Sequence, residues 1–490
     1  MVTVSGWGFV GEFLAFLDEI GFYALLGIEG KGFRRVMIPI ARLVMTYQMK
    51  VLLGIGSINL VPTKLFRQVA LMKLIGYTTA EMAAGFCERG KLLSGPMHKN
   101  TLADAVERLR AEELEQVLNE TASRLRARGL FAASKGHFAL DATDLETTAK
   151  YGGAGVKKYT EWKWDTKEKK AVEVERLAHG FKVLVVYEVR LRLVVAAKVV
   201  PINEHESGFT LALVRQAVKN LGSGVVRVLL MDRGFLDGQD LWVLKTELGI
   251  DFVVPSKDKM RVTGDARGLA RQAADGECVS KAERRGKKKV GKDGKERWEG
   301  QVSAVGVANL TTYDQYGDEG HARRANRKDF VGNHINAVVV TKWQGEEYRV
   351  GEEKVFLSSL PVSEPLGVLD LYDLRSLIEN TAFRELKQGW NLKSYPKKTE
   401  AAVRGHVFLT LLTFTLANAF RSSLGQELAK HGIRRQRAEE CDDNVIVFAG
   451  DYYAIFHIEE VFILLGVVPE VLLRADPREL SRRYGLALAA

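Results

Sequence analysis

The apolar residues at the start of the chain recur at helical spacing. The run 36–58 is interrupted by arginine, glutamine and lysine, so it predicts a buried amphipathic helix rather than a membrane span. A second apolar stripe lies in 100–131 and opens on Asn100 and Thr101, residue types that cap helix N-termini. Residues 1–130 are therefore expected to form a helical domain.

The segment 76–90 predicts a pair of short helices. Thr78 or Thr79 is expected to cap an alanine-rich helix that ends near Gly90. A helix-turn-helix of this kind could read DNA, but short helix pairs are also common packing units. Both interpretations of 76–90 remain open at this stage.

The apolar pattern changes to that of β-structure after residue 137. The stretches 137–148 and 179–203 are rich in valine, leucine and tyrosine and predict three strands, the last two as a hairpin. A helix over 207–222 should stop at Gly222, and a strand–helix–strand unit follows over 225–256. Strands in succession followed by such a unit predict a mixed α/β sheet.

Residues 257–365 break the alternation of strands and helices. They carry basic runs at 281–297 and 321–330, followed by short strand-like pieces. Helices are expected again over 369–390 and 401–420. The basic runs suit contacts with phosphates, although lysine-rich loops are often only solvated turns.

Composition and charge narrow the class of protein. The 490 residues are 46% hydrophobic and 27% charged, as in a globular protein of several domains, and 71 Lys and Arg against 61 Asp and Glu give a charge of +10. This excess suits a polyanionic partner. The three scattered cysteines exclude a CxxC-type zinc site and favour a reducing compartment. The N-terminus lacks the pattern of a secretory signal, and 27–33 lacks that of a phosphate-binding loop, so we expect a cytoplasmic protein without a nucleotide cofactor.

Two predicted strands end in an acidic residue. Asp141 closes the first strand and Asp232 closes the strand of 225–232, while Asp144 lies just behind Asp141 as a rival. If these strands are neighbours, Asp141 and Asp232 meet at one edge of the sheet. Two converging carboxylates repel each other unless they are protonated or bridged by a cation, and Mg²⁺ is a hard ion that prefers carboxylate ligands. The alternative is that each acid only marks a turn at the surface.

Glu379 is the candidate for a third acid. On a helix over 369–390 it shares one face with Tyr372 and Arg375. A buried carboxylate among apolar neighbours needs a partner, because an unpaired buried charge is costly. Arg375 stands one turn earlier, so an ion pair of purely structural importance is the competing interpretation.

These motifs together resemble the DDE transposases of the IS4-like superfamily. The stretches "ALDATD", "LLMDRGF" and "YDLRSLIENTAFRELK" carry the resemblance. In that family the second acid lies in an aspartate–arginine–glycine–aromatic stretch, and the third lies in a Tyr-x-x-Arg-x-x-x-Glu helix with a lysine about two turns later. Tyr372, Arg375 and Glu379 match this spacing. The commonest position of the lysine is Leu386 here, and Lys387 follows one residue later, about 80° away from Glu379 on an ideal helix.

The resemblance implies a fold and a metal site. The fold is an RNase H-like mixed α/β sheet flanked by helices, with an inserted β-rich subdomain and a helical N-terminal domain. Asp141, Asp232 and Glu379 would hold two Mg²⁺ ions, for which Mn²⁺ could substitute. The expected domains are a helical, possibly end-binding domain at 1–130, the first part of the catalytic core at 131–256, a basic β-rich insertion at 257–365, the helical completion of the core at 366–430, and a C-terminal, possibly dimerising segment at 431–490.

The resemblance also implies an activity and its partners. The enzyme would cut the inverted-repeat ends of a transposon and join the 3′-hydroxyl to target DNA, as a homodimer on DNA in the cytoplasm, or on the nucleoid if prokaryotic. Tyr372, Arg375 and Lys387 would hold phosphates near the cut. An RNase H-like nuclease without strand transfer, or a DNA-binding derivative without catalysis, are the alternatives. In the insertion, phosphate contacts would come from Arg284, Arg285, Lys287, Lys288 and Lys289. Trp298 or Trp343 could stack a flipped base, but a purely structural tryptophan is the favoured alternative for both.

Overall fold

A computed structural model describes most of the chain. Two compact units divide the polypeptide. The first unit comprises 1–132, 147–154 and 385–490, and the second comprises 133–146 and 155–384. The described residues are 2–5, 8–27, 33, 37–86, 95–165, 170–272, 278–284, 287–290, 296–299, 302–318, 332–342, 353–430, 444–449, 452–457 and 488–489.

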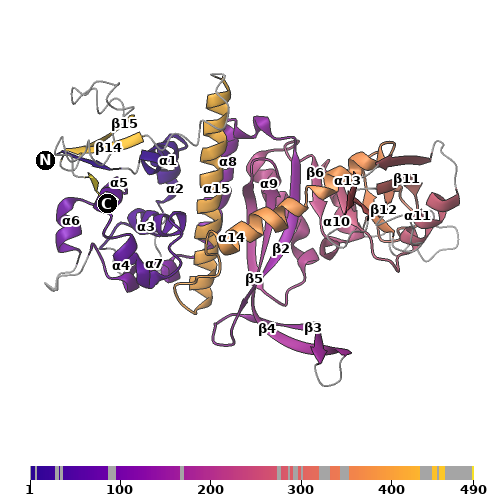
Figure 1. Cartoon of the computed structure of the whole chain (residues 1–490), viewed down its shortest axis with the longest axis horizontal. Helices are drawn as coiled ribbons and strands as arrows, with labels where there is room; N and C mark the ends of the chain where they lie inside the picture. The colour runs from indigo at the N-terminus through magenta and orange to yellow at the C-terminus, as the bar shows by residue number, and fades with distance from the viewer. Residues whose placement is uncertain are drawn as a thin grey trace. The chain divides into compact units, whose positions relative to one another are not determined.

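The first unit is mainly helical, as the apolar pattern predicts, and it also contains a small sheet (Figure 1). The sheet has the order β15-β14-β1-β16. Its elements are α1 (Gly8–Glu19), α2 (Phe22–Leu25), α3 (Ile40–Leu52), η1 (Ile58–Leu60), α4 (Val61–Lys64), α5 (Val69–Leu74), α6 (Thr79–Ala84), α7 (Lys99–Arg108), α8 (Ala111–Ala127), η2 (Leu130–Ala133), α14 (Arg384–Gln388), α15 (Glu400–Lys430), β1 (Val2–Ser5), β14 (Asn444–Ala449), β15 (Tyr452–His457) and β16 (Leu488–Ala489).

Two helix boundaries in this unit differ from the predicted ones. Thr78 caps α6 through a reciprocal bond with Glu81, as the sequence predicts, but the helix already ends at Ala84. The prediction that Asn100 and Thr101 cap the helical stretch within 100–131 was wrong. His98 is the cap, and the helix breaks where Leu109 takes an extended conformation. The break lets the Leu109 side chain reach the core, where it is 2% exposed.

Helix α15 forms the centre of the first unit. Of the described helices, it alone has a segment, Glu400–Ser423, that is long and apolar enough to cross a membrane, yet 94% of its most apolar stretch is buried in the protein. His406 on α15 is fully buried and hydrogen-bonds the Tyr47 hydroxyl of α3 at 2.8 Å. Both features are those of the core helix of a globular unit.

The second unit is built on one large mixed sheet. Its strands run in the order β3-β4-β2-β6-β7-β13-β12-β11-β8, with β5 paired to β4. The strands are β2 (His137–Thr147), β3 (Gly155–Asp165), β4 (Lys170–Glu188), β5 (Leu193–Pro201), β6 (Val228–Met231), β7 (Asp251–Pro255), β8 (Val279–Arg284), β11 (Val302–Leu310), β12 (Ile335–Lys342) and β13 (Lys354–Ser358), and β9 (Lys287–Val290) and β10 (Glu296–Glu299) form a separate pair.

The centre of this sheet has the predicted α/β topology. Strands β4 and β5 form the predicted antiparallel hairpin, and β2, β6 and β7 are parallel neighbours. The helices are α9 (Thr210–Leu221), which ends at Gly222 as predicted, α10 (Gly238–Thr246), α11 (Arg261–Gln272) and α13 (Pro365–Asp373). The order β5-β4-β2-β6-β7 is the one expected of an RNase H-like core, so the predicted fold class is confirmed. Strands β13, β12, β11 and β8 extend that sheet beyond β7.

Strand β3 is an element that the sequence pattern did not reveal. It pairs with the first half of β4 over its whole length, from Gly155↔Gly180 to Asp165↔Lys170, and lies at the edge of the sheet. The two strands form a ribbon that extends away from the rest of the sheet (Figure 1). We call residues 155–165 and 170–180 the β3–β4 ribbon.

Candidate active site

Asp141 and Asp232 lie side by side at one edge of the central sheet. Strands β2 and β6 are parallel neighbours, and their last registered pair is Leu140↔Met231. The next residue on each chain is the aspartate. Neighbouring strands lie about 4.8 Å apart, so the backbones bring the two acids together without help from any loop. Asp232 follows the end of β6 as predicted, but β2 continues to Thr147, so the prediction that Asp141 closes its strand was wrong. The two acids are nevertheless neighbours on parallel strands, as expected.

The two aspartates differ in their surroundings. Asp141 is 5% exposed, and its Oδ1 accepts a hydrogen bond of 2.8 Å from the amide of Ala142. Asp232 is half-buried and precedes the short helix η4 (Arg233–Phe235), which is anchored by the fully buried Phe235. A strand end followed by an anchored turn gives a carboxylate a fixed position at the rim of the sheet.

The helix predicted over 369–390 is not continuous, and this part of the prediction was wrong. Helix α13 ends at Asp373, tight turns connect it to a π-helical turn η5 (Ile378–Phe383), and α14 follows. Such π-helical turns are uncommon and occur often at functional sites. Glu379 lies in the first turn of η5, with a side chain that is 52% exposed, so it is not the buried acid that the helical face predicted.

Arg375 connects the third acid to the first. Its Nη1 atom lies 2.8 Å from Asp141 Oδ2 and 3.0 Å from Glu379 Oε1. Its Nε donates to the hydroxyl of Tyr372 at 3.1 Å, and the Tyr372 ring packs on Phe356 with centroids 4.5 Å apart. The intrahelical ion pair considered from the sequence therefore exists, but it is one half of a bridge to Asp141.

The pKa values reflect this concentration of charge. The pKa of the Asp141 carboxyl is raised to about 7, chiefly by burial and also by Glu379 and Asp232, while Arg375 and the Ala142 amide oppose the shift. Burial lowers the pKa of Arg375, but Asp141, Tyr372, Glu379 and Asp232 more than offset that effect, so its pKa is raised. Burial thus disfavours the charged form of Asp141, and a neighbouring cation favours it.

The donor set suits a hard divalent cation. Asp141 and Glu379 both contact the Arg375 guanidinium, which supplies positive charge there, and Asp232 follows the end of the strand beside Asp141. As the side chains of the described residues stand, no three His, Cys, Asp or Glu groups are arranged to hold a metal ion. Oxygen-only ligands at the rim of a sheet are nevertheless those that Mg²⁺ and Mn²⁺ accept. The residues present therefore fit such an ion, with Arg375 in competition for the same oxygens.

Asp144, the rival of Asp141, has other partners. Its Oδ2 atom accepts hydrogen bonds from Lys157 Nζ, at 2.8 Å, and from the Tyr159 hydroxyl, both on β3. Residues 141 and 144 also project from opposite faces of β2, because side chains alternate along a strand. Asp144 is thus an anchor for the β3–β4 ribbon.

The remaining predicted residues fall in several places. Lys387 lies in α14, and the residues of that helix from Glu385 onward belong to the first unit. Arg284 at the end of β8 forms an ion pair with Asp370 of α13 at 2.7 Å. Outside the described residues, or without a described side chain, are Arg285, Lys287, Lys288, Lys289, Trp298, Trp343 and the second basic run at 321–330.

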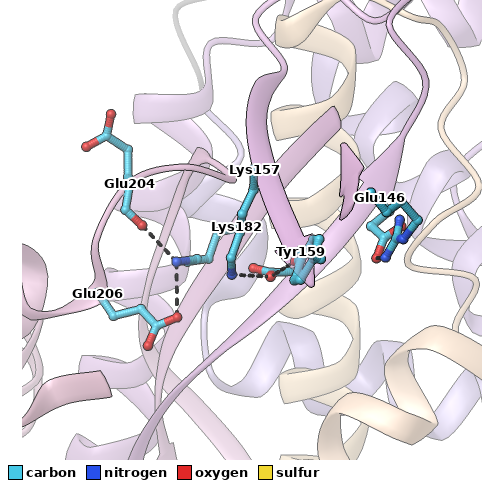
Figure 2. A network of polar contacts seen from close by, with 8 residues as sticks. Glu146, Lys157, Tyr159, Lys182, Glu204 and Glu206 are labelled. Carbon is cyan, nitrogen blue, oxygen red and sulfur yellow. Dashed lines mark hydrogen bonds and ion pairs between the residues drawn. The ribbon is translucent and has the colours of Figure 1, made fainter. Parts of the chain in front are cut away.

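A second network near the turn after Asp232 could not be predicted from the sequence. Lys182 is 4% exposed, and its Nζ lies 2.7 Å from the carbonyl oxygen of Glu204 and 3.0 Å from Glu206 Oε1 (Figure 2). Glu206 in turn contacts the turn after Asp232, because a Cβ atom added to Gly234 would stand only 2.1 Å from its Oε2. Gly234 is thus required by close packing, and the Lys182–Glu206 pair supports the turn that carries the acid.

Comparisons with known proteins bear on this geometry. No curated protein matches the chain. Among solved structures, a piggyBac transposase synaptic complex with hairpin DNA is similar at 10% identity, over 89% of this chain and 79% of that chain, with a TM-score of 0.40. The family model "Transposase DDE domain" matches residues 132–416, which is more than half of the 490 residues and includes all three acids. The chain therefore belongs to the family of DDE-domain transposases.

Proposed function

We propose that this chain is an IS4-like transposase that cuts the ends of its element and joins the freed 3′-hydroxyl to target DNA with Mg²⁺. The observation that carries the proposal is the placement of Asp141 and Asp232 directly after the last registered pair of two adjacent parallel strands, with Glu379 linked to Asp141 through Arg375. Membership of the DDE family supports the same three residues. Mn²⁺ is the expected substitute ion.

Each residue has a distinct part in the proposed chemistry. Asp141, Asp232 and Glu379 would hold two divalent cations, which supply charge stabilisation for an in-line displacement at a DNA phosphate. Arg375 would then leave the carboxylates of Asp141 and Glu379 and bind a phosphate oxygen, since a planar guanidinium can bind either group. Tyr372 would orient Arg375 through the bond to Nε. The Lys182–Glu206 pair would keep the turn after Asp232 in place.

The proposed partners are DNA and a second copy of the chain. The inverted-repeat ends and the target would meet the acids at the sheet edge, and Lys387 together with the basic residues 284–289 would add contacts to phosphates. Arg284 already has a carboxylate partner in Asp370, so it would contribute to DNA binding only after leaving that ion pair. Assembly as a homodimer on DNA and a cytoplasmic location complete the proposal.

A nuclease without strand transfer is the second candidate. It would use the same carboxylates, so only the product separates the two activities. Incubating pre-cut end DNA with supercoiled target DNA and Mg²⁺ tests this directly. Joined product supports the transposase, whereas cutting without joining supports the nuclease. A derivative without catalysis is disfavoured, because all three acids are present.

The site itself is tested by Asp232→Asn. We expect loss of cutting in Mg²⁺, with binding of end DNA unchanged or tighter, because a negative charge that faces phosphates is removed. Asp251→Asn is the matched control, since Asp251 begins the neighbouring strand β7 at the opposite edge of the sheet and pairs with Lys245. It should cut normally. Joint loss of binding and cutting by Asp232→Asn would instead assign this acid a structural role.

A further inference from the structure

One face of the β3–β4 ribbon is apolar and exposed. In an antiparallel pair, directly opposite residues project to the same side, so 156, 158, 160, 162 and 164 of β3 share a face with 171, 173, 175, 177 and 179 of β4. Trp162 is 70% exposed, Trp164 67%, Leu177 64% and Val156 47%. Exposed tryptophans of this extent on a strand pair mark an interaction surface rather than a fold requirement.

The opposite face of the ribbon is already used. Lys157 and Tyr159 bind Asp144, and Arg176 forms ion pairs with Glu146 and with Glu161. Figure 2 shows Lys157 and Tyr159 at this junction. Because Asp144 lies on β2, three residues beyond Asp141, the ribbon is fixed to the strand that carries the first acid. The tryptophans therefore lie on a ribbon that these contacts hold in place.

Charges on the exposed face argue against DNA as its partner. Glu173 lies directly opposite Trp162, and Glu175 lies opposite Thr160. Lys158 on the same face is already paired with Glu175. A phosphate backbone laid along the tryptophans would meet two carboxylates, which disfavours it. A protein surface with apolar groups and charges of both signs suits this face better.

The face is complementary to itself when it is reversed end to end. Its tip carries Trp162, Trp164 and Glu173, and its base carries Val156, Lys158 and Leu177. We propose that this face docks against the same face of a second copy of the chain, with the two ribbons antiparallel. The tip tryptophans of each copy then cover Val156 and the aliphatic stem of Lys158 of the other. The Lys158 ammonium would exchange Glu175 of its own chain for Glu173 of the other copy.

The expected interface is large enough for a measurable dimer. Each of the four indoles can bury about 150–250 Å². With Val156 and Leu177 of both copies, the total approaches the roughly 1,200 Å² at which specific interfaces begin. The arrangement is isologous, so the contacts close on a pair and do not propagate. This inference gives the proposed homodimer a surface, and it does not depend on the catalytic assignment.

The first experiment measures self-association without DNA. In sedimentation velocity, the full chain should form dimers that Leu177→Ser weakens at least tenfold, and that Trp162→Ser with Trp164→Ser abolishes. Leu269→Ser is the matched control, because Leu269 is an exposed leucine of the same unit on α11, 43% exposed and away from the ribbon. Circular dichroism reports whether each variant remains folded.

The second experiment tests the antiparallel register. Lys158→Glu and Glu173→Lys should each lower dimer affinity at least tenfold, because each places like charges together twice across the two-fold axis. An equimolar mixture of the two variants should dimerise again, since both contacts then join opposite charges.

Thr160→Cys, at the middle of the face, should cross-link with a bismaleimide of about 10 Å span, the distance between packed sheets. Glu161→Cys on the opposite face should not, with both variants made after Cys87, Cys278 and Cys441 are changed to serine.

The outcomes separate this inference from the transposase assignment. A wild-type monomer at tens of micromolar, or a dimer that the tryptophan variants leave unchanged, overturns the docking surface while leaving catalysis untouched. Loss of DNA binding by the tryptophan variants with unchanged self-association also overturns it and makes the face a nucleic-acid platform. Failure of the charge mixture to restore the dimer overturns the antiparallel register. Restored association in that mixture supports the proposed contact as a whole.

Discussion

Arg375 and Asp141, 234 positions apart in the chain, form an ion pair of 2.8 Å in which both side chains are nearly buried. The same Arg375 nitrogen lies 3.0 Å from Glu379. One guanidinium therefore contacts two of the three acids and offsets part of their negative charge. Because of this relationship, the charge balance among the acids affects the stability of the protein, which can be measured without any DNA.

We expect Arg375→Gln to destabilise the metal-free protein and to make its stability depend on Mg²⁺. Removing one partner of a buried ion pair costs about 3–5 kcal/mol, because the other charge remains uncompensated. A divalent ion could replace the lost charge, so adding Mg²⁺ should raise the thermal midpoint more in the variant than in the wild type. Arg215→Gln, which removes an exposed pair with Glu247, is the control and should show no such dependence. Equal Mg²⁺ shifts in all three proteins would contradict the expectation.

The two aspartates of β2, Asp141 and Asp144, should have different roles. Asp144→Asn keeps the shape of the side chain but weakens its bonds with Lys157 and Tyr159, so it should loosen the ribbon and retain cutting of end DNA. Asp141→Asn should abolish cutting. Hydrogen exchange of the ribbon amides and cleavage assays on the same preparations check both statements. A reversed pattern would make Asp144 the metal ligand.

Gly234→Ala should be destabilising because of Glu206, and not because of backbone conformation. The added methyl group would stand 2.1 Å from Glu206 Oε2, and overpacking of this kind costs about 1–3 kcal/mol. In a Glu206→Ala background the same substitution should cost much less, which is a coupling that a double-mutant cycle measures by denaturant unfolding. Additive effects would show that the carboxylate does not touch the turn.

Neutralising the basic run should change the salt dependence of DNA binding. Replacing Arg285, Lys287, Lys288 and Lys289 with glutamine removes four positive charges but no acid of the proposed site. If these residues follow the phosphate backbone, the slope of log K against log salt should flatten by up to about 0.9 per lost contact. Fluorescence anisotropy at several salt concentrations gives the slope. An unchanged slope would identify the run as a solvated loop.

Lys50 should make the stability of the first unit depend on pH. Its side chain is 1% exposed, its Nζ has no hydrogen-bond partner among the described residues, and burial lowers its pKa to about 8 from 10.5. A lowered pKa in the folded state means that protonation of Lys50 destabilises the fold. This cost is absent above pH 10.5, grows as pH falls, and reaches its full size below about pH 8.

Lys50→Met removes this penalty and should therefore stabilise the protein most at pH 7, by an amount on the order of a few kcal/mol. The gain should shrink as pH approaches 10. Lys64→Met, at an exposed position of the same unit, is the control. Thermal midpoints at pH 7 and pH 10 test the difference, and a gain that is equal at both pH values would mean that packing alone is responsible.

The sequence predicted local features well and long-range ones poorly. The strands that carry Asp141 and precede Asp232 could be recognised because their apolar runs stop at an acid, although β2 continues past Asp141. The helix before Gly222 could be recognised by its stop residue. The Arg375–Asp141 pair could not, since nothing local distinguishes an arginine that pairs within its helix from one that reaches another strand. Strand β3 was missed because its charged residues alternate with tryptophans that the protein leaves exposed, so the usual apolar signal of a buried strand is absent.

The π-helical turn at Ile378–Phe383 affects how the one-residue displacement of Lys387 is interpreted. A π-helical turn holds one residue more than an α-helical turn needs, because its hydrogen bonds span five residues instead of four. The stretch from Glu379 to Lys387 is also one residue longer than the commonest family spacing. The π-helical turn overlaps the stretch from Glu379 to Lys387, and both the turn and this stretch contain one residue more than expected. We therefore expect the π-helical turn to accommodate the additional residue, so that Lys387 can keep the role proposed for it near the cut.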